Sequence, residues 1–143
     1  MAEDAFTGLK VLLVDDEPFI QRLIGRMLND MGIKSVTPAA DGASALDRIC
    51  KSAGAFDLII CDLEMPAMNG FDFVRALRND KGIPNPGVPV LILTGAASQE
   101  YLEESIRLGI HGFLAKPVSK TTLETRIVSA LNAPPIDPKV LER

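Results

Sequence analysis

Five short apolar runs, each followed by a segment with helical periodicity, constrain the fold of this chain more than any other feature. The runs contain mainly β-branched and other apolar residues, as is typical of strands that a parallel sheet buries on both faces. They predict strands over residues 10–14, 35–38, 57–61, 89–93 and 112–115. We therefore expect a parallel sheet with helices packed on both of its faces.

The segment after the first apolar run has the clearest helical pattern. Pro18 opens it, Gly32 closes it, and its apolar residues fall on one stripe that should pack against the sheet. The stripe consists of Phe19, Ile20, Leu23, Ile24, Met27, Leu28 and Met31. Further helices are predicted over 43–51, 71–79, 98–108 and 120–131, the last with a stripe of Leu123, Ile127, Val128 and Leu131.

Strict alternation of strands and helices predicts a (βα)₅ doubly wound α/β fold, a three-layer sandwich with the flavodoxin-like strand order 2-1-3-4-5. With 143 residues, of which 47% are hydrophobic, the chain is expected to be one domain that folds alone. That domain covers residues 10–131, after an N-terminal extension over 1–9. Residues 132–143 contain three prolines and are interpreted as a frayed C-terminal tail or a truncated linker.

The charge and hydropathy of the chain exclude two classes of partner. A net charge of -4 leaves no basic stripe for a nucleic-acid backbone, so direct nucleic-acid binding is not expected. The N-terminus lacks the pattern of a secretory signal, and no apolar stretch is long enough to insert into a membrane. We expect a cytoplasmic protein, in which Cys50 and Cys61, too isolated for a metal or redox motif, are buried and reduced.

Polar residues follow four of the five predicted strands. In chain order they are Asp15, Asp16 and Glu17, then Asp62, Thr94 and Lys116. Ligands of open α/β sheets bind at this carboxyl edge. Because the first and third strands are neighbours, Asp15, Asp16 and Asp62 should converge, and their mutual repulsion requires a cation. Oxygen-only ligands favour Mg²⁺, for which Mn²⁺ can substitute.

This arrangement suits phosphoryl transfer. A divalent cation offsets the repulsion between Asp62, the predicted nucleophile, and an incoming phosphoryl group, while Lys116 can pair with a phosphoryl oxygen. Taken singly, Asp15 and Asp16 are more typical of a helix cap. Thr94 alone would be an ordinary strand-end hydroxyl, and Lys116 a solvated surface charge. Their coincidence at successive strand ends favours a functional site.

Five motifs together carry a resemblance to a known family. They are VLLVDDE at 11–17, DLIICDLEMP at 57–66, Asn69-Gly70, LTG at 93–95 and GFLAKP at 112–117. With this spacing, residues 10–131 resemble the response regulator receiver family of two-component signalling, to which the chemotaxis response regulator belongs. The resemblance implies a receiver that accepts a phosphoryl group from a histidine kinase or a histidine phosphotransfer protein.

The resemblance assigns a role to each acidic residue of the site. It implies that Asp62 is the phosphoacceptor. The Mg²⁺ ligands would be Asp15, Asp16, Asp62 and the backbone carbonyl of Glu64. The Glu64 side chain either influences hydrolysis of the acyl phosphate or is a solvated loop acid. Departures from the family pattern fall outside this set, at Ser44, Ala67 and Gly95.

The resemblance also implies how a signal leaves the site. Thr94 and Lys116 would grip the phosphoryl group, and movement of Thr94 would let the aromatic Phe113 turn inward. The output surface would be the fourth helix, fifth strand and fifth helix, facing a downstream protein target or a missing output domain. The Lys116–Pro117 bond is a candidate cis peptide. The single histidine, His111, lies in a predicted turn, so the phosphoryl donor is another molecule.

Two other functions are compatible with part of the pattern. A Mg²⁺-dependent phosphatase of the haloacid dehalogenase type also uses an aspartate nucleophile, but it requires Asp-x-Asp where this chain has Asp-Asp-Glu. A pseudo-receiver would bind partners without phosphorylation, and retention of all five site residues argues against it. We do not expect an enzyme, beyond assistance to the chain's own phosphorylation and dephosphorylation.

Overall fold

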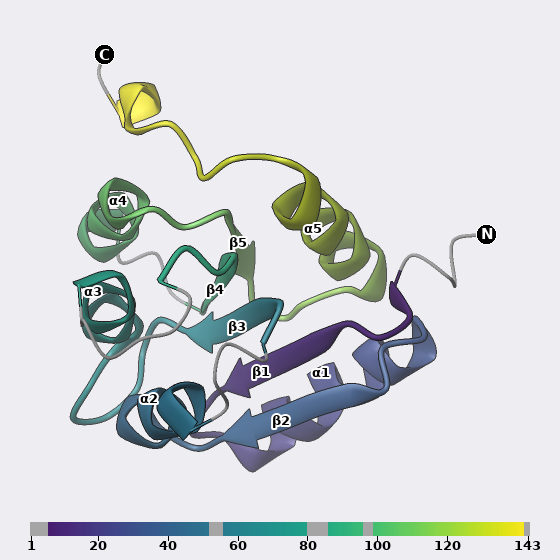
Figure 1. Cartoon of the computed structure of the whole chain (residues 1–143). Helices are drawn as coiled ribbons and strands as arrows, with labels where there is room; N and C mark the ends of the chain where they lie inside the picture. Colours follow the sequence, from purple (N-terminus) through teal and green to yellow (C-terminus); the bar gives the residue numbers. More distant parts are fainter. Residues whose placement is uncertain (1–5, 52–55, 80–85, 96–98, 142–143) are drawn as a thin grey trace.

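The computed structural model describes residues 6–51, 56–79, 86–95 and 99–141. In this part of the chain, five parallel strands follow the order β2-β1-β3-β4-β5, which confirms the predicted topology (Figure 1). The strands are β1 (Lys10–Val14), β2 (Ser35–Ala39), β3 (Leu58–Asp62), β4 (Val90–Thr94) and β5 (Gly112–Ala115). Each boundary lies within one residue of the prediction.

The described α-helices alternate with the strands. They are α1 (Pro18–Asp30), α2 (Gly42–Lys51), α3 (Gly70–Asn79), α4 (Gln99–Leu108) and α5 (Lys120–Asn132). Helices α1 and α5 cover one face of the sheet and the other three cover the opposite face (Figure 1), which confirms the three-layer sandwich. Residue 98, where the fourth helix was predicted to begin, lies outside the described residues. Among the helices that are described, none has the length and apolar character needed to span a membrane.

Alternate residues of the buried strands contribute to two apolar cores. Leu13 of β1 belongs to the core under α1, with Ile24 and Leu28 of that helix. Its neighbour Leu12 belongs to the opposite core, with Phe73 of α3. All five side chains are at most 1% exposed. Burying a side chain of this size contributes about 1.5–3 kcal/mol, so the two cores hold the sheet whose carboxyl edge carries the site.

The prediction that every strand is buried on both faces is wrong for the two edge strands. Strand β3 is buried throughout, but β2 is fully buried only at Ala39, and β5 alternates between buried and exposed residues. An edge strand has one neighbouring strand instead of two, so more of its surface reaches solvent. Phe113 of β5 is accordingly 39% exposed.

Three side chains are more exposed than predicted. Phe19, expected in the buried stripe of α1, is 65% exposed; it stands in the first turn of the helix and lines a small cavity together with Ile20 and Val118. Val128 of α5 is 45% exposed, since the apolar stripe is wider than the helix's contact with the sheet. Cys61 is buried in β3 as predicted, but Cys50 is exposed near the end of α2.

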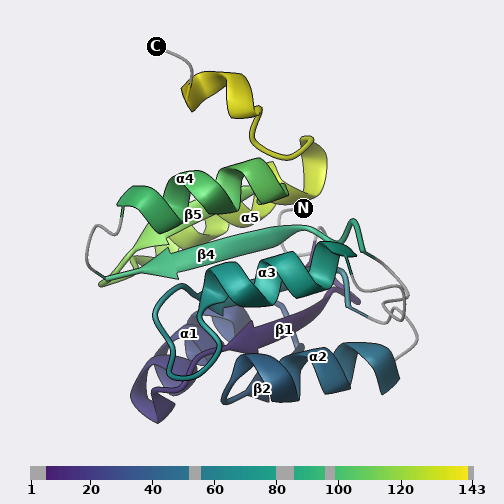
Figure 2. The same cartoon turned by 90° about the vertical axis from the view of Figure 1, so that its left-hand side faces the viewer.

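The proline-containing tail contacts the domain. The backbone N–H of Ile136 donates a hydrogen bond to the carbonyl of Ile110, 2.9 Å away, and its side chain packs on the core under α3 and α4. A short 3₁₀ helix, η2 (Pro138–Leu141), then lies beside α4 (Figure 2). Next to this contact, His111 occupies the turn before β5, as predicted, and its Nδ1 accepts a hydrogen bond from the Val90 N–H at 3.3 Å.

Candidate functional site

An acidic cluster lies at the carboxyl edge of the sheet, where the strand ends were predicted to meet. The register pairs Val14 of β1 with Cys61 of β3, which brings the next residues, Asp15 and Asp62, side by side. The cluster consists of Asp15, Asp16, Glu17 and Asp62, and one carboxylate oxygen from each residue lies within 4.8 Å of those from the other three. The predicted convergence of three aspartates is confirmed, and Glu17 joins them.

Two members of the cluster are buried and two are exposed. Asp15 and Asp62 are only 1% and 2% exposed, whereas Asp16 and Glu17 face solvent. Burial raises the pKa of both Asp15 and Asp62 above the ordinary value of 3.8. In Asp15 this effect is opposed by the Glu17 N–H, which donates to Oδ1 at 2.8 Å. Ionised carboxylates in such a place require a nearby positive charge.

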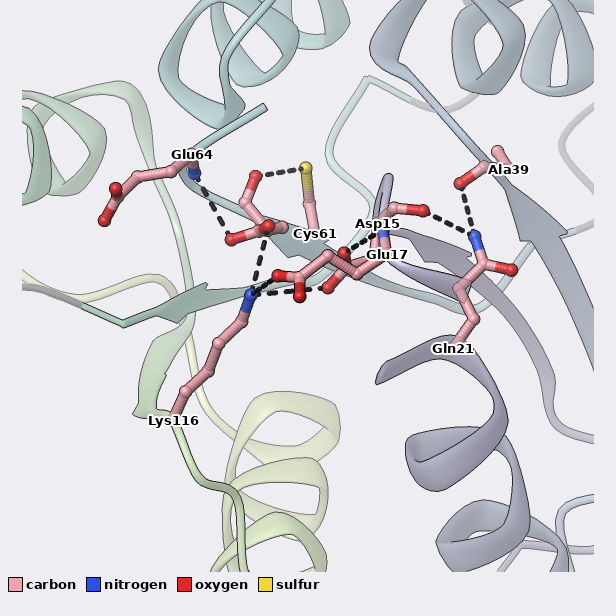
Figure 3. A network of polar contacts seen from close by, with 8 residues as sticks. Asp15, Glu17, Gln21, Ala39, Cys61, Glu64 and Lys116 are labelled. Atoms are coloured by element: carbon pink, nitrogen blue, oxygen red, sulfur yellow. Dashed lines mark hydrogen bonds and ion pairs between the residues drawn. The ribbon is translucent and has the colours of Figure 1, made fainter. Parts of the chain in front are cut away.

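Lys116 brings a cation into the cluster. Its ammonium nitrogen Nζ lies 3.1 Å from Oδ2 of Asp62, 3.5 Å from Oδ2 of Asp15 and 3.5 Å from Oε1 of Glu17 (Figure 3). Partial burial lowers the pKa of Lys116, but the hydrogen bond to Asp62 and its charge outweigh burial, so the pKa lies above its usual value. The Lys116–Pro117 peptide bond is cis, as predicted.

The donor set of the cluster fits a hard divalent cation. The cluster has four carboxylates, and three of them lie within 3.5 Å of the single ammonium group of Lys116, so negative charge is in excess. The buried Oδ2 atom of Asp15 accepts no hydrogen bond from the described residues, which is the condition expected of an oxygen that ligates a metal. Carboxylate oxygens, without sulfur or imidazole, are typical ligands of cations such as Mg²⁺.

An open cleft of ≈ 400 Å³ gives access to the cluster. Its lining consists of Asp16, Glu17, Asp62, Glu64, Gly95 and Lys116. Glu64 lies beside the predicted acceptor, where its side chain is exposed and its backbone N–H donates to Oδ1 of Asp62 at 3.2 Å. A small substrate can therefore reach the Asp62 carboxylate from solvent.

The two predicted switch residues lie on β4 and β5. Thr94 is the last residue of β4, and its carbonyl accepts a hydrogen bond from the Lys116 N–H at 2.9 Å. The predicted phosphoryl-binding residues thus come from adjoining strand ends. Leu114 of β5 packs in the core under α5, so its neighbour Phe113 points to the opposite face of the sheet, where it is partly exposed.

Two residues shape the site without being predicted from the sequence as part of it. Glu17 contributes a carboxylate to the cluster, and its place directly after Asp15 and Asp16 was the available signal. Gln21, in α1, donates hydrogen bonds from its side-chain amide to the carbonyls of Asp15 and Ala39. A polar residue directly after Ile20, inside an apolar stripe, was the only hint in the sequence.

A parallel sheet of order 2-1-3-4-5, with an acidic cleft and a lysine at its carboxyl edge, defines a receiver-type signalling domain. Comparison with protein families agrees, because the model of the response regulator receiver domain matches residues 11–128. The chain therefore belongs to the response regulator receiver family of two-component systems.

Individual relatives share this architecture. The chain is 33% identical over 120 residues to the chemotaxis protein CheY-3 of Vibrio cholerae, covering 84% of this chain and 89% of the relative. The solved structure of Vibrio cholerae CheY4 has a TM-score of 0.76 at 38% identity, covering 86% of this chain and 98% of that chain. The receiver domain of the sensor histidine kinase PA1611 of Pseudomonas aeruginosa has a TM-score of 0.72 at 29% identity, covering 89% and 100%.

Proposed function

We propose that this receiver accepts a phosphoryl group on Asp62 with Mg²⁺ as cofactor. The observation that carries the proposal is the position of the Asp62 carboxylate, which is buried among the acidic residues of the cluster and 3.1 Å from the Lys116 ammonium. A carboxylate so placed is a suitable nucleophile, because positive charge beside it offsets its repulsion of phosphoryl oxygens.

The acidic cluster would hold the cation. Its ligands would be Asp15, Asp16, Asp62 and the backbone carbonyl of Glu64. When bound, Mg²⁺ supplies positive charge to the phosphoryl oxygens during transfer, and Mn²⁺ can substitute for it. The receiver domain of PA1611 was solved with a magnesium ion coordinated in its active-site cleft, which supports the same assignment here.

Asp62 acts as the nucleophile of the transfer. One of its carboxylate oxygens forms a bond to phosphorus while the bond from phosphorus to the donor's imidazole nitrogen breaks, and that electron pair leaves with the nitrogen. Lys116 binds one phosphoryl oxygen, and the hydroxyl of Thr94 binds another. Attack by water later returns the free carboxylate and releases inorganic phosphate.

The phosphoryl group then changes the charge beside the end of β4. It adds about one to two negative charges, which draw the Thr94 hydroxyl toward the site. Phe113, whose side chain is partly exposed in this structure, turns inward in response. The surface formed by α4, β5 and α5 changes shape and contacts a downstream protein target or an output domain.

A histidine kinase or a histidine phosphotransfer protein is the proposed donor, acting with this chain in the cytoplasm. Receiver domains of histidine kinases are among the structural neighbours. His111 is partly buried and hydrogen-bonded in its turn, which supports a donor histidine on another molecule.

The protein is proposed to be a switch rather than an enzyme. Neither a pseudo-receiver nor a haloacid dehalogenase-type phosphatase is favoured, because the acidic cluster and Lys116 together form a site complete for phosphoryl acceptance.

Labelling by acetyl phosphate tests the proposal. Incubation with acetyl phosphate and Mg²⁺ should raise the mass of the wild-type chain by about 80 Da, the mass of one phosphoryl group. Asp62→Ala should remain unlabelled. Asp47→Ala removes an exposed aspartate that pairs with Lys51 in α2, and this control should be labelled like wild type. Equal labelling of Asp62→Ala would contradict the assignment of the acceptor.

A further inference from the structure

Gln21 connects three elements beside the acidic cluster. Its side-chain Nε2 donates hydrogen bonds to the backbone carbonyls of Asp15, 2.7 Å away, and Ala39, 2.8 Å away (Figure 3). The Ala39 carbonyl also accepts a hydrogen bond from the Asp15 N–H at 3.0 Å. One amide from α1 therefore ties the residue that follows β1 to the last residue of β2.

The Asp15 carbonyl belongs to the peptide unit that joins Asp15 to Asp16. Because a peptide unit is planar, fixing its carbonyl also fixes the direction in which the Asp16 backbone leaves it. The Asp15 side chain is held separately, by the Glu17 N–H that donates to Oδ1 at 2.8 Å. Asp16 is exposed, so the direction of its carboxylate depends largely on the backbone that carries it.

The Gln21 side chain is itself held in place. Its backbone N–H donates to the Glu17 carbonyl at 3.1 Å, which anchors the residue in the first turns of α1. The side chain is partly buried in a groove between α1 and the sheet whose other lining residues include Leu13, Pro18, Val36 and Pro38. Apolar side chains therefore pack around part of the Gln21 side chain, in a groove that is open to solvent.

We propose that Gln21 is a positioning residue of the cation site, because its amide fixes the Asp15–Asp16 peptide and so directs the Asp16 carboxylate toward the Mg²⁺ site beside that of Asp15. The inference rests on the proposed function, since it concerns the affinity of the same site. Hydrogen bonds that orient metal ligands typically change metal affinity by about 10- to 100-fold. Gln21 bonds the backbone rather than the ligand oxygens, so we expect the lower end of this range.

Gln21→Met tests the inference, because methionine has nearly the same length and no donor. Magnesium titration calorimetry on the full chain should give a dissociation constant about tenfold weaker than that of wild type. In acetyl phosphate labelling, the half-saturating Mg²⁺ concentration should rise by a similar factor, while the rate at saturating Mg²⁺ stays within about twofold of wild type. Asn132→Met removes another amide that donates to a backbone carbonyl, that of Val128, and this control should bind Mg²⁺ like wild type.

Thermal unfolding in EDTA separates a positioning role of Gln21 from a purely structural one. A purely structural role would lower the melting temperature without changing the affinity for magnesium. If Gln21→Met does not fold, Gln21→Asn replaces it, because the shorter side chain leaves the amide one methylene away from the two carbonyls. Wild-type magnesium affinity in the folded variants would overturn the inference and leave the proposed function standing. Absence of magnesium binding by the wild-type chain would overturn the proposed function, and the inference with it.

Discussion

The ammonium nitrogen of Lys116 lies closer to Asp62, at 3.1 Å from Oδ2, than to any other carboxylate of the cluster. Lys116 directly follows β5, and Asp62 is the last residue of β3. These two strands are not neighbours in the sheet, because β4 lies between them. Their contact therefore depends on the whole sheet edge. It offsets part of the buried negative charge of Asp62 and places a cation where a phosphoryl oxygen would lie.

Removal of this cation should slow phosphorylation. Lys116→Met leaves Asp62 without its charge partner, so the rate of labelling by acetyl phosphate at saturating Mg²⁺ should fall by at least about tenfold. Intact-mass spectrometry over time gives the rate. Lys120→Met, at an exposed position at the start of α5, serves as the control. A Lys116→Met rate equal to that of the control would exclude a role in transfer.

Asp15 should destabilise the metal-free protein at neutral pH. Burial raises the pKa of Asp15 above 3.8 in the folded state. At pH values between 3.8 and this raised pKa, the folded state therefore binds more protons than the unfolded chain. The free energy of unfolding contributed by Asp15 therefore rises as pH falls through this window. Asp15→Asn removes the titration, so in EDTA this variant should be more stable than wild type at pH 7, with an advantage that shrinks toward pH 4.

The comparison between the two proteins cancels the titration of groups that lie away from the cluster, while the charge of Asp15, which adds to burial in raising the pKa of Asp62, contributes to the difference. Burial lowers the pKa of His111 below 6.5, which acts in the opposite direction and destabilises both proteins equally as pH falls. Urea unfolding at several pH values in EDTA measures the difference. Saturating Mg²⁺ should reverse the order at pH 7, since ligand binding stabilises only the folded state that binds it. A pH-independent difference would contradict the account of Asp15.

Ala67 should be a source of strain in the loop that follows β3. Its φ of 67° lies in the left-handed region, where a side chain costs about 1–2 kcal/mol and glycine is preferred. Ala67→Gly should raise the free energy of unfolding by about 0.5–1 kcal/mol, after allowance for the greater freedom of glycine in the unfolded chain. Ala43→Gly, at an exposed helical position of α2, should instead lower it. Denaturant unfolding of both variants checks the opposite signs.

Gly70 should tolerate no side chain, because it packs on the backbone of the acceptor strand. A Cβ at this position would lie 2.6 Å from the Asp62 carbonyl oxygen and 2.8 Å from Cα of Leu63. Gly70→Ala should lower the free energy of unfolding by about 1–3 kcal/mol and slow labelling of Asp62. At Gly25 of α1, a Cβ meets nothing within 4 Å, so Gly25→Ala should stabilise the protein by up to about 1 kcal/mol. Equal effects of the two substitutions would refute this reading of Gly70.

The helices, the strands and the residues at the strand ends could be predicted from the sequence, because they depend on the local spacing of apolar residues. The apolar run at 58–61 is short and contains two β-branched residues, as is typical of a buried strand, and the topology then places Asp62 beside Asp15. Exposure of Phe19 and Phe113 was not predictable, because it depends on where the sheet ends rather than on helical or strand period.

The contacts that support the site also could not be predicted from the sequence. The hydrogen bonds of Gln21 join segments that meet only after the sheet has formed, so a local pattern cannot identify the carbonyls that accept them. Likewise, the left-handed conformation of Ala67 follows from the path that the loop takes back to α3, where the N–H of Gly70 donates to the Leu63 carbonyl at 2.8 Å. Such features depend on tertiary geometry rather than on residue type.

Location of the phosphoryl group tests the central claim most directly. After labelling with acetyl phosphate and Mg²⁺, borohydride reduction converts an aspartyl phosphate to homoserine, which peptide mass spectrometry can locate in the chain. We predict homoserine at position 62 and at no other aspartate. Homoserine at Asp15 or Asp16, or at no position, would contradict the assignment of Asp62 as the phosphoacceptor.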